Sequence, residues 1–329
     1  MKHENFFKDF LDKEVNLNPG RLNTLEKRKS AVTRFLEDNV SDYVKVSAQG
    51  SYAHKTIIKP VKDNDKFDAD LLVFLKDSKF DPDHYDRDYV KELYDVFQGD
   101  ERYENKVDLK ARCIRIDYSG DFRLDIVPCI EYDKYAYVNN QQDSEYEKTD
   151  SEGYSNWIAD CNKRIGGNYM RESVRLLKFL RDHKDNFSVK SILLTTLVGK
   201  AAWRVAPDSC NNTPTALKIL SNNVNDFLSK NSDMPEVKNP VLQEENFNRH
   251  WDDAQYKNFC EKFSSYCEKI NDAYEEEDHN ESVKKWRKLF GEQFGELRDN
   301  NQSFAAGLGA AAASSGAIAA VKPYGGKCD

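Results

Sequence analysis

The sequence contains no long apolar stretch. No run of about 18 apolar residues occurs in its 329 residues, so we expect no membrane-spanning helix. The opening segment, MKHENFFKDFLDKE, is charged throughout and lacks the apolar centre of a secretory signal peptide. We therefore expect an intracellular, cytoplasmic protein that has no membrane association.

Paired cysteines are also missing. The seven cysteines are scattered and odd in number, and no two of them form a Cys-x-x-Cys pair. This pattern predicts free thiols in a reducing compartment. Cys260 and Cys267 lie seven residues apart, with His250 and His279 in the neighbourhood. A zinc site is one interpretation of this group, and one face of a core helix is the interpretation we favour.

The chain has no excess of positive charge. It carries 49 Lys and Arg against 57 Asp and Glu, a net charge of −8. An acidic surface repels phosphate backbones at long range, so we expect no binding of long nucleic acid. A local basic cleft or a small phosphorylated substrate remains compatible with this charge. The apolar content of 39% is sufficient for a globular chain with a sizeable core.

The first half of the chain has the periodicity of a mixed sheet with helices. Helical spacing of apolar residues and strand-like alternation follow one another, and a tight Ser-Gly-Asp turn joins the last two strands into a hairpin. The predicted helices span 21–38, 52–58 and 83–97, and the predicted strands span 43–49, 67–75, 112–118 and 122–130.

The second half is helical and ends in a different composition. The predicted helices span 168–183, 188–203, 250–277 and 283–290, and another begins at Thr213-Pro214, with the Thr213 hydroxyl as its cap. Residues 303–320 are rich in Ala, Ser and Gly, which predicts a flexible tail. We expect an α+β fold with a catalytic core at 1–165, a helical lobe at 166–300 that completes a nucleotide cleft, and a tail at 301–329.

Two carboxylates stand at the start of the strongest predicted strand. Asp68 and Asp70 are two residues apart, so the alternation of a strand puts both on one face. The apolar run 71–75 that follows implies burial, and buried paired carboxylates need a counter-charge. Mg²⁺ supplies one, because it prefers carboxylate and phosphate oxygens. A solvated strand start is the structural alternative.

Asp125 is a third acid, flanked by apolar residues in the last predicted strand. Its structural alternative is an ion pair with Arg115 or Arg123, and Asp117 on the partner strand is a rival for the same role. We prefer Asp125 because its flanking residues indicate deeper burial. If it joins Asp68 and Asp70, the three acids predict a site that holds two metal ions.

Gln49-Gly50-Ser51 follows a predicted strand directly. Glycine lets the backbone approach a ligand closely, and the following amides and the Ser51 hydroxyl can bind a phosphate. Gly-Ser turns are common, so the dipeptide gains weight only beside the three acids. Together these segments predict two-metal nucleotidyl transfer, in which metals roughly 3.5–4 Å apart clamp the attacking and leaving oxygens. Attack on the α-phosphorus would release pyrophosphate, with positioning and charge neutralisation supplying most of the catalysis.

These residues resemble those of the DNA polymerase β-like nucleotidyltransferases, and within them the bacterial cGAS/DncV-like nucleotidyltransferases (CD-NTases). The resemblance spans 20–295 and rests on 49–56, 67–71 and 124–128. Ala69 departs from it, because a larger β-branched residue is usual there. No His–Cys–Cys–Cys cluster like that of animal cGAS is present, which argues against activation by double-stranded DNA.

The resemblance implies further site residues and cofactors. Lys178 resembles the family lysine that reaches the donor triphosphate, and Ser191 resembles the serine that contacts the same phosphates. Taken alone, Lys178 is equally consistent with a solvated surface charge. The family uses two Mg²⁺ ions, for which Mn²⁺ can substitute.

The implied activity is the synthesis of cyclic di- or trinucleotides, or of short linear oligonucleotides, as second messengers of anti-phage (CBASS) defence. Some members are controlled by or conjugated to other proteins through the C-terminus. The ending 321–329 makes that one hypothesis here, beside a simple disordered end. A transferase acting on tRNA, protein or a small molecule, and a non-catalytic nucleotide-binding module, stay open as alternatives. Base choice, linkage and ring size are not readable from the sequence.

Overall fold

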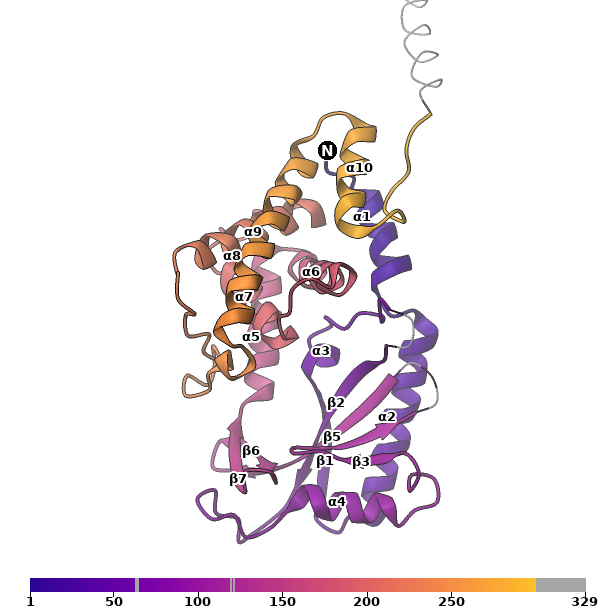
Figure 1. The fold of residues 1–329 in the computed structure, drawn as a ribbon. Helices are drawn as coiled ribbons and strands as arrows, with labels where there is room; N and C mark the ends of the chain where they lie inside the picture. The colour runs from indigo at the N-terminus through magenta and orange to yellow at the C-terminus, as the bar shows by residue number, and fades with distance from the viewer. Residues whose placement is uncertain (63–64, 119, 121, 300–329) are drawn as a thin grey trace, which may run out of the picture.

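The computed structural model describes residues 1–62, 65–118, 120 and 122–299. The tail predicted for 301–329, with its suggested partner, therefore lies outside the described residues. Figure 1 shows a part built around a sheet, at the bottom of the view, and a helical part above it. No helix among the described residues is both long and apolar enough to cross a membrane.

A mixed seven-stranded sheet forms the first part. Its strands are β1 (Tyr43–Gln49), β2 (Phe67–Leu75), β3 (Val107–Leu109), β4 (Ile114–Asp117), β5 (Phe122–Tyr132), β6 (Tyr135–Asn140) and β7 (Glu145–Thr149). The order is β1-β2-β5-β4-β3, and β6 pairs with β5 and β7. β2 runs parallel to β5, whereas the other pairs are antiparallel. The predicted hairpin is confirmed as β4 and β5.

One face of this sheet is covered by two helices, α2 (Pro19–Asn39) and α4 (Tyr89–Gln98). Alternate residues of β2, from Phe67 to Leu75, pack in the same core as apolar residues of both helices. Leu72 and Phe74 instead belong to a smaller cluster on the opposite face. By strand alternation Asp68 and Asp70 share that opposite face, as the sequence predicted.

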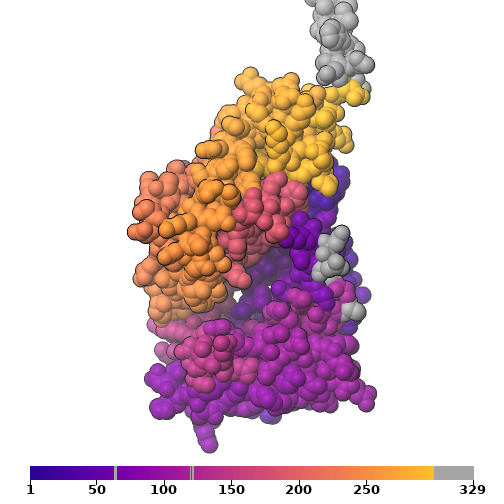
Figure 2. Space-filling view, in the orientation of Figure 1, coloured from indigo at the N-terminus to yellow at the C-terminus, as the bar shows by residue number. Residues whose placement is uncertain are grey.

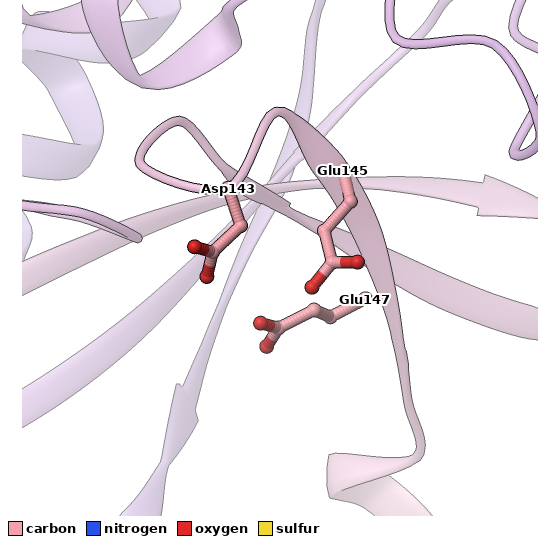
Figure 3. Close-up of side chains that lie close together, drawn as sticks. All are labelled: Asp143, Glu145 and Glu147. Carbon is pink, nitrogen blue, oxygen red and sulfur yellow. The ribbon is translucent and has the colours of Figure 1, made fainter.

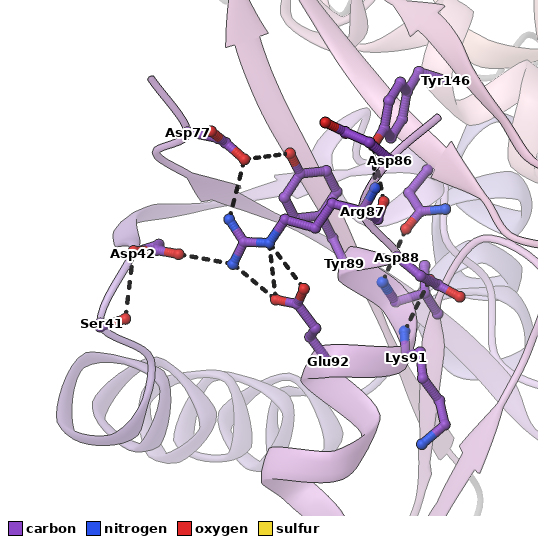
Figure 4. Close-up of polar contacts among 12 residues, drawn as sticks. Ser41, Asp42, Asp77, Asp86, Arg87, Asp88, Tyr89, Lys91, Glu92 and Tyr146 are labelled. Carbon is purple, nitrogen blue, oxygen red and sulfur yellow. Dashed lines mark hydrogen bonds and ion pairs between the residues drawn. The ribbon is translucent and has the colours of Figure 1, made fainter. Parts of the chain in front are cut away.

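The loop that leads into α4 is held by Arg87 (Figure 4). Its guanidinium donates to Asp77 at 3.1 Å, to Asp42 at 2.8 Å and to Glu92 at 2.7 Å. The Tyr89 hydroxyl also donates to Asp77, at 2.9 Å. These contacts join the turn between α2 and β1, the loop after β2 and the first turn of α4. We assign this network a structural role.

The second part consists of packed helices. They are α5 (Ser151–Ile165), α6 (Tyr169–Lys184), α7 (Ser191–Ala202), α8 (Thr213–Ser229), α9 (Asp253–Glu275) and α10 (His279–Phe290). Their apolar faces form one continuous core. The last predicted helix ends at residue 290 as expected, and Gly291 lies at the C-cap of α10 with φ 95°. The α+β fold class with a helical C-terminal region is thus confirmed.

The N-terminal segment packs on this helical part and not on the sheet. α1 (Glu4–Phe10) and a short π-helical turn (Leu11–Val15) bury Phe7 and Phe10 in the helical core. Phe7 meets Trp286 of α10 edge-on, with ring centroids 4.8 Å apart. Figure 1 shows α1 beside α10, far from β1. The two ends of the described chain therefore meet in the helical part.

The structure corrects two predicted helices and one predicted helix cap. The helix after β1, α3 (Gly50–Ala53), begins at Gly50 itself and is over before residue 58. α4 begins at Tyr89 and not at 83, because the Asp88 carboxylate caps it by accepting from the Lys91 amide. α8 is capped by Asn212 and not by Thr213, whose hydroxyl donates to Glu172 instead.

The cysteines are free thiols among the described residues. Cys260 and Cys267 both lie on α9, and the buried Cys267 thiol contacts the Asn222 side chain at 3.0 Å. The interpretation as one helix face is therefore confirmed for this pair.

Candidate active site

The strand register aligns the predicted residues in one row across the sheet. Gln49 of β1 pairs with Asp70 of β2, and Asp70 pairs with Asp125 of β5. Arg115 of β4 continues the row beyond Asp125. Because residues paired across neighbouring strands share a face, Asp70 and Asp125 point to the same side of the sheet. The parallel β2–β5 pairing thus brings together acids far apart in the sequence.

Asp125 is held by an arginine. The Arg115 Nε and Nη2 atoms donate to the two carboxylate oxygens at 2.7 and 2.8 Å, a bidentate ion pair. The ion pair between Asp125 and Arg115, which was the structural alternative for Asp125, is therefore present. It lies next to Asp70 in the sheet. The rival acid, Asp117, is engaged by Lys66 and Arg123.

Asp68 and Asp70 have no such cationic partner among the described residues. The Oδ1 atom of Asp68 is buried and makes no hydrogen bond. Burial raises the pKa of Asp68. Burial, and then the charges of Asp125 and Asp68, raise the pKa of Asp70 to about 7. The row of acids is thus short of positive charge, which is the electrostatic condition for binding a cation.

Gly50 makes the closest backbone approach to this row. A Cβ atom added there would lie 2.3 Å from Asp70 Oδ2, and Gly50 has φ +64°, in the left-handed region. The first turn of α3 therefore passes directly over the Asp70 carboxylate. The sequence predicted a close approach of Gly50 to a bound phosphate, whereas the approach that the structure shows is to the Asp70 carboxylate.

A cavity of about 430 Å³ opens at this point between the sheet part and the helical part. Figure 2 shows the surface hollowed there, below the helical part. Of the eight predicted site residues, seven line the cavity: Gly50, Ser51, Asp68, Asp70, Asp125, Lys178 and Ser191. Gln49 precedes it as the N-cap of α3 and is not among the lining residues.

Lys178 lies on α6, and its side chain crosses from the helical part to the sheet part. The Nζ atom donates to the Thr56 carbonyl at 3.0 Å, and the side chain is 3% exposed. A solvated surface charge, the alternative for this residue, is therefore wrong. Burial, and then the nearby Arg181, lower the pKa of Lys178 to about 7.

Ser191 is the first residue of α7, and this helix begins at the cavity wall. Its N-cap, Lys190, provides no side-chain hydrogen bond to the first turn. Ser191, Ile192 and Thr195 of α7 line the cavity. An uncapped helix N-terminus carries free amides and partial positive charge, which together favour a bound phosphate.

A second group of acids lies on the surface, away from this cavity. Asp143, Glu145 and Glu147, near the β6–β7 turn, have ligand atoms within 4.8 Å of one another (Figure 3). Among the described residues, the ligand atoms of this group lie within 4.8 Å of one another, whereas those of Asp68, Asp70 and Asp125 do not form such a group. However, Arg112 already binds both oxygens of Glu147, and Asn140 donates to Asp143. We therefore give the surface group no metal role.

Several residues at or beside the cavity were not predicted as site residues. Arg115 was named only as a partner of Asp125, whereas His54, Thr56 and Arg181 were not singled out. Burial, with the charge of Lys178 second, lowers the pKa of His54 to about 4, so it is neutral at pH 7. His54 and Thr56 lie within 49–56, the segment on which the family resemblance rests, so the sequence did point to the region that contains them.

Comparison with known proteins relates this chain to a family. The model of the Second Messenger Oligonucleotide or Dinucleotide Synthetase domain (SMODS) matches residues 1–162. A c-di-GMP synthase from Roseivirga ehrenbergii is 25% identical over 281 residues, which cover 74% of this chain and 73% of that protein. These matches relate the chain to the bacterial CD-NTases. Members of this family are metal-dependent nucleotidyltransferases.

Solved CD-NTases share the fold. The Escherichia coli MS115-1 CdnC structure with ATP superposes with a TM-score of 0.69 at 19% identity, covering 89% of this chain and 99% of that one. Vibrio cholerae DncV, solved with the linear intermediate 5′ pppA(3′,5′)pG, gives 0.72 at 15% identity, covering 90% and 98%. At these identities the likeness shows the fold, so the expected polymerase β-like fold class is confirmed.

Proposed function

We propose that this protein joins ribonucleoside triphosphates into a cyclic oligonucleotide, with Asp68, Asp70 and Asp125 at the reacting centre. The observation that carries the proposal is the shared cavity. Three acids from two parallel strands, the Gly50 turn and two residues of the helical part all border one space. We infer that 1–165 supply the acids and that 166–300 complete the nucleotide cleft.

The acids fit divalent metal ions. Asp68 offers a buried oxygen with no partner, and burial together with the charges of Asp125 and Asp68 raises the pKa of Asp70. All the donors are carboxylate oxygens, the type that Mg²⁺ prefers. We propose that Asp68, Asp70 and Asp125 hold two Mg²⁺ ions, for which Mn²⁺ can substitute. When bound, the ions would neutralise the triphosphate and activate the acceptor hydroxyl.

The surroundings of the acids fit a triphosphate. The amides of α3 after Gly50, the Ser51 hydroxyl and the N-terminus of α7 at Ser191 all border the cavity. Lys178 adds an amino group on the same wall, and a bound phosphate would favour its positively charged form. These groups would hold the donor phosphates in place and direct the α-phosphorus toward the acids. Positioning of this kind supplies most of the catalysis in phosphoryl transfer.

The similarity to a c-di-GMP synthase makes GTP the first donor and acceptor to test. We also infer the family role for the product, a second messenger in anti-phage defence. The cavity volume of about 430 Å³ is typical of a small-molecule site, and the side chains around it do not by themselves assign the base, the linkage or the ring size.

The direct test is to incubate the purified protein with all four ribonucleoside triphosphates and Mg²⁺ or Mn²⁺. The products are treated with phosphatase and identified by mass spectrometry. The Asp68→Asn/Asp70→Asn double variant is the inactive control, and Glu147→Gln is the matched control at the surface acids. We expect a phosphatase-resistant cyclic product from the wild type and from Glu147→Gln, and none from the double variant.

The outcomes separate the candidate functions. Product at wild-type level from the double variant would contradict the assigned acids. A nucleotide attached only to added tRNA or protein would favour a transferase with a macromolecular acceptor. Metal-dependent nucleotide binding without any product would favour the non-catalytic module.

A further inference from the structure

Arg181 is a cation of the cavity wall to which neither the sequence pattern nor the family resemblance gives a role. It lies on α6 one turn after Lys178, so both side chains lie on the same helix face and border the cavity. Its side chain is 17% exposed. Lys178 and Arg181 thus give this helix face two cationic side chains at the cavity, where a bound anion would lessen their mutual repulsion.

The hydrogen bonds of Arg181 connect it to the start of α7. Its Nη1 atom donates to the Val189 carbonyl at 2.8 Å and to the Ser191 Oγ at 3.2 Å. Its Nε and Nη2 atoms donate to the carboxylate of Asp182, the next residue, at 2.7 and 3.2 Å. A guanidinium has five N–H donors, and these contacts occupy four of them. Arg181 therefore has little capacity left for several direct phosphate contacts.

The contact to Ser191 has a directional consequence. A serine hydroxyl carries one hydrogen and accepts through its lone pairs. Because Arg181 donates to the Ser191 oxygen, that oxygen serves as the acceptor in this contact, and the hydroxyl hydrogen stays available to donate elsewhere. Ser191 borders the cavity, where a phosphate oxygen would be the acceptor.

We propose that Arg181 is a positioning residue for the donor triphosphate, which orients the Ser191 hydroxyl as a donor and fixes the uncapped start of α7 at the cavity. This inference rests on the proposed function, because it takes the cavity to hold a nucleoside triphosphate. It adds a residue that acts through Ser191 and through the α7 amides. The hydrogen bond from Arg181 to the Val189 carbonyl holds the segment just before α7. One guanidinium therefore positions both the Ser191 hydroxyl and the first amides of α7.

The test measures the binding of nucleotides that cannot react. The α,β-methylene analogues of GTP and ATP are titrated with Mg²⁺ by calorimetry, and GMP and AMP are titrated in the same way. The variants are Arg181→Gln, Arg181→Lys, Ser191→Ala and Arg181→Gln/Ser191→Ala. Arg164→Gln is the matched control, because the Arg164 Nε also donates to a backbone carbonyl, that of Val205, at 3.1 Å in the helical part.

We expect Arg181→Gln to weaken binding of the triphosphate analogue by roughly tenfold or more, the effect of losing a hydrogen bond made by a charged group. Binding of the monophosphate should change little, because the Ser191 end of the cavity then has no phosphate to hold. The double variant should bind no more weakly than the weaker single variant, since Arg181 acts through Ser191. Arg164→Gln should bind like the wild type.

The proposal is overturned if Arg181→Gln weakens the triphosphate analogue and the monophosphate equally, or if the two single losses multiply in the double variant. Full recovery in Arg181→Lys would show that charge alone suffices, which also overturns the positioning role. If Arg181→Gln does not fold, Arg181→Lys decides: a loss confined to the triphosphate analogue supports the proposal, and no loss contradicts it. Failure of the wild type to bind either analogue would instead count against the proposed function.

Discussion

Replacing Gly50 with alanine tests whether the first turn of α3 sets the position of the Asp70 carboxylate. The added Cβ would lie 2.3 Å from Asp70 Oδ2, whereas ordinary contacts begin at 3.4 Å. The oxygen or the turn must therefore move by about 1 Å, a displacement that costs roughly a hundredfold in rate when it affects reacting groups. The left-handed φ of +64° adds a backbone cost of about 1–2 kcal/mol.

The assay separates these two effects with a matched control. Gly166 also has a positive φ, +89°, but an added Cβ there meets nothing closer than 3.4 Å. Both Gly50→Ala and Gly166→Ala should lower the melting temperature by several degrees, at about 2–4 °C per kcal/mol. Only Gly50→Ala should lose product formation, by roughly a hundredfold. Retention of near wild-type activity by Gly50→Ala, or an equal loss in Gly166→Ala, would refute the reasoning.

Three further predictions concern the acids. Burial raises the pKa of Asp70 from 3.8 to about 7, so the folded protein holds a proton on Asp70 that the unfolded chain loses near pH 4. Asp70 therefore makes the metal-free protein less stable as the pH rises from about 4 to 7. Asp70→Asn should flatten this dependence of the melting temperature on pH and abolish product formation. Arg115→Gln removes the partner of both Asp125 oxygens. The variant should bind Mn²⁺ more tightly in calorimetry, and its metal-free form should have a lower melting temperature than the wild type. Weaker Mn²⁺ binding would contradict this prediction. Glu147→Gln loses a partly exposed pair with Arg112 and should keep wild-type kcat and KM, whereas a loss of activity would implicate the surface acids.

The strand that carries two of the acids was readable from the sequence because its pattern is local. An apolar run after Asp68 and Asp70 marks a buried strand, and alternation assigns both carboxylates to one face. The placement of Asp125 beside Asp70 was not readable in this way. It depends on β2 and β5 pairing in parallel, and no local signal specifies which strands pair or in which register.

The N-terminal segment shows how a signal was present but missed. Phe6, Phe7, Phe10 and Leu11 have helical spacing, although the charges between them dominate the composition. In the structure this stripe packs against α10, almost the whole chain away. A short helix gains its stability from such tertiary contacts, which explains why the local sequence gave little indication of it.

The burial of Lys178 could not be predicted from the local sequence. Its sequence neighbourhood does not distinguish a surface lysine from a buried one, and only the resemblance to CD-NTases singled it out. Its environment is created by Thr56, from a segment 122 residues earlier. The Arg181 contact to Ser191 is likewise a product of how α6 and α7 meet, so neither contact could be predicted from periodicity or composition.

The central claim is that the three acids bind metal ions that act on the α-phosphate of the donor. Replacing one α-phosphate oxygen of GTP with sulfur gives two diastereomers, and Mg²⁺ coordinates sulfur poorly compared with softer ions. We predict that the enzyme uses one diastereomer in Mg²⁺ and fails on the other, and that Mn²⁺ or Cd²⁺ restores product from the second. Equal use of both diastereomers in Mg²⁺, with no effect of the softer ions, would contradict the account.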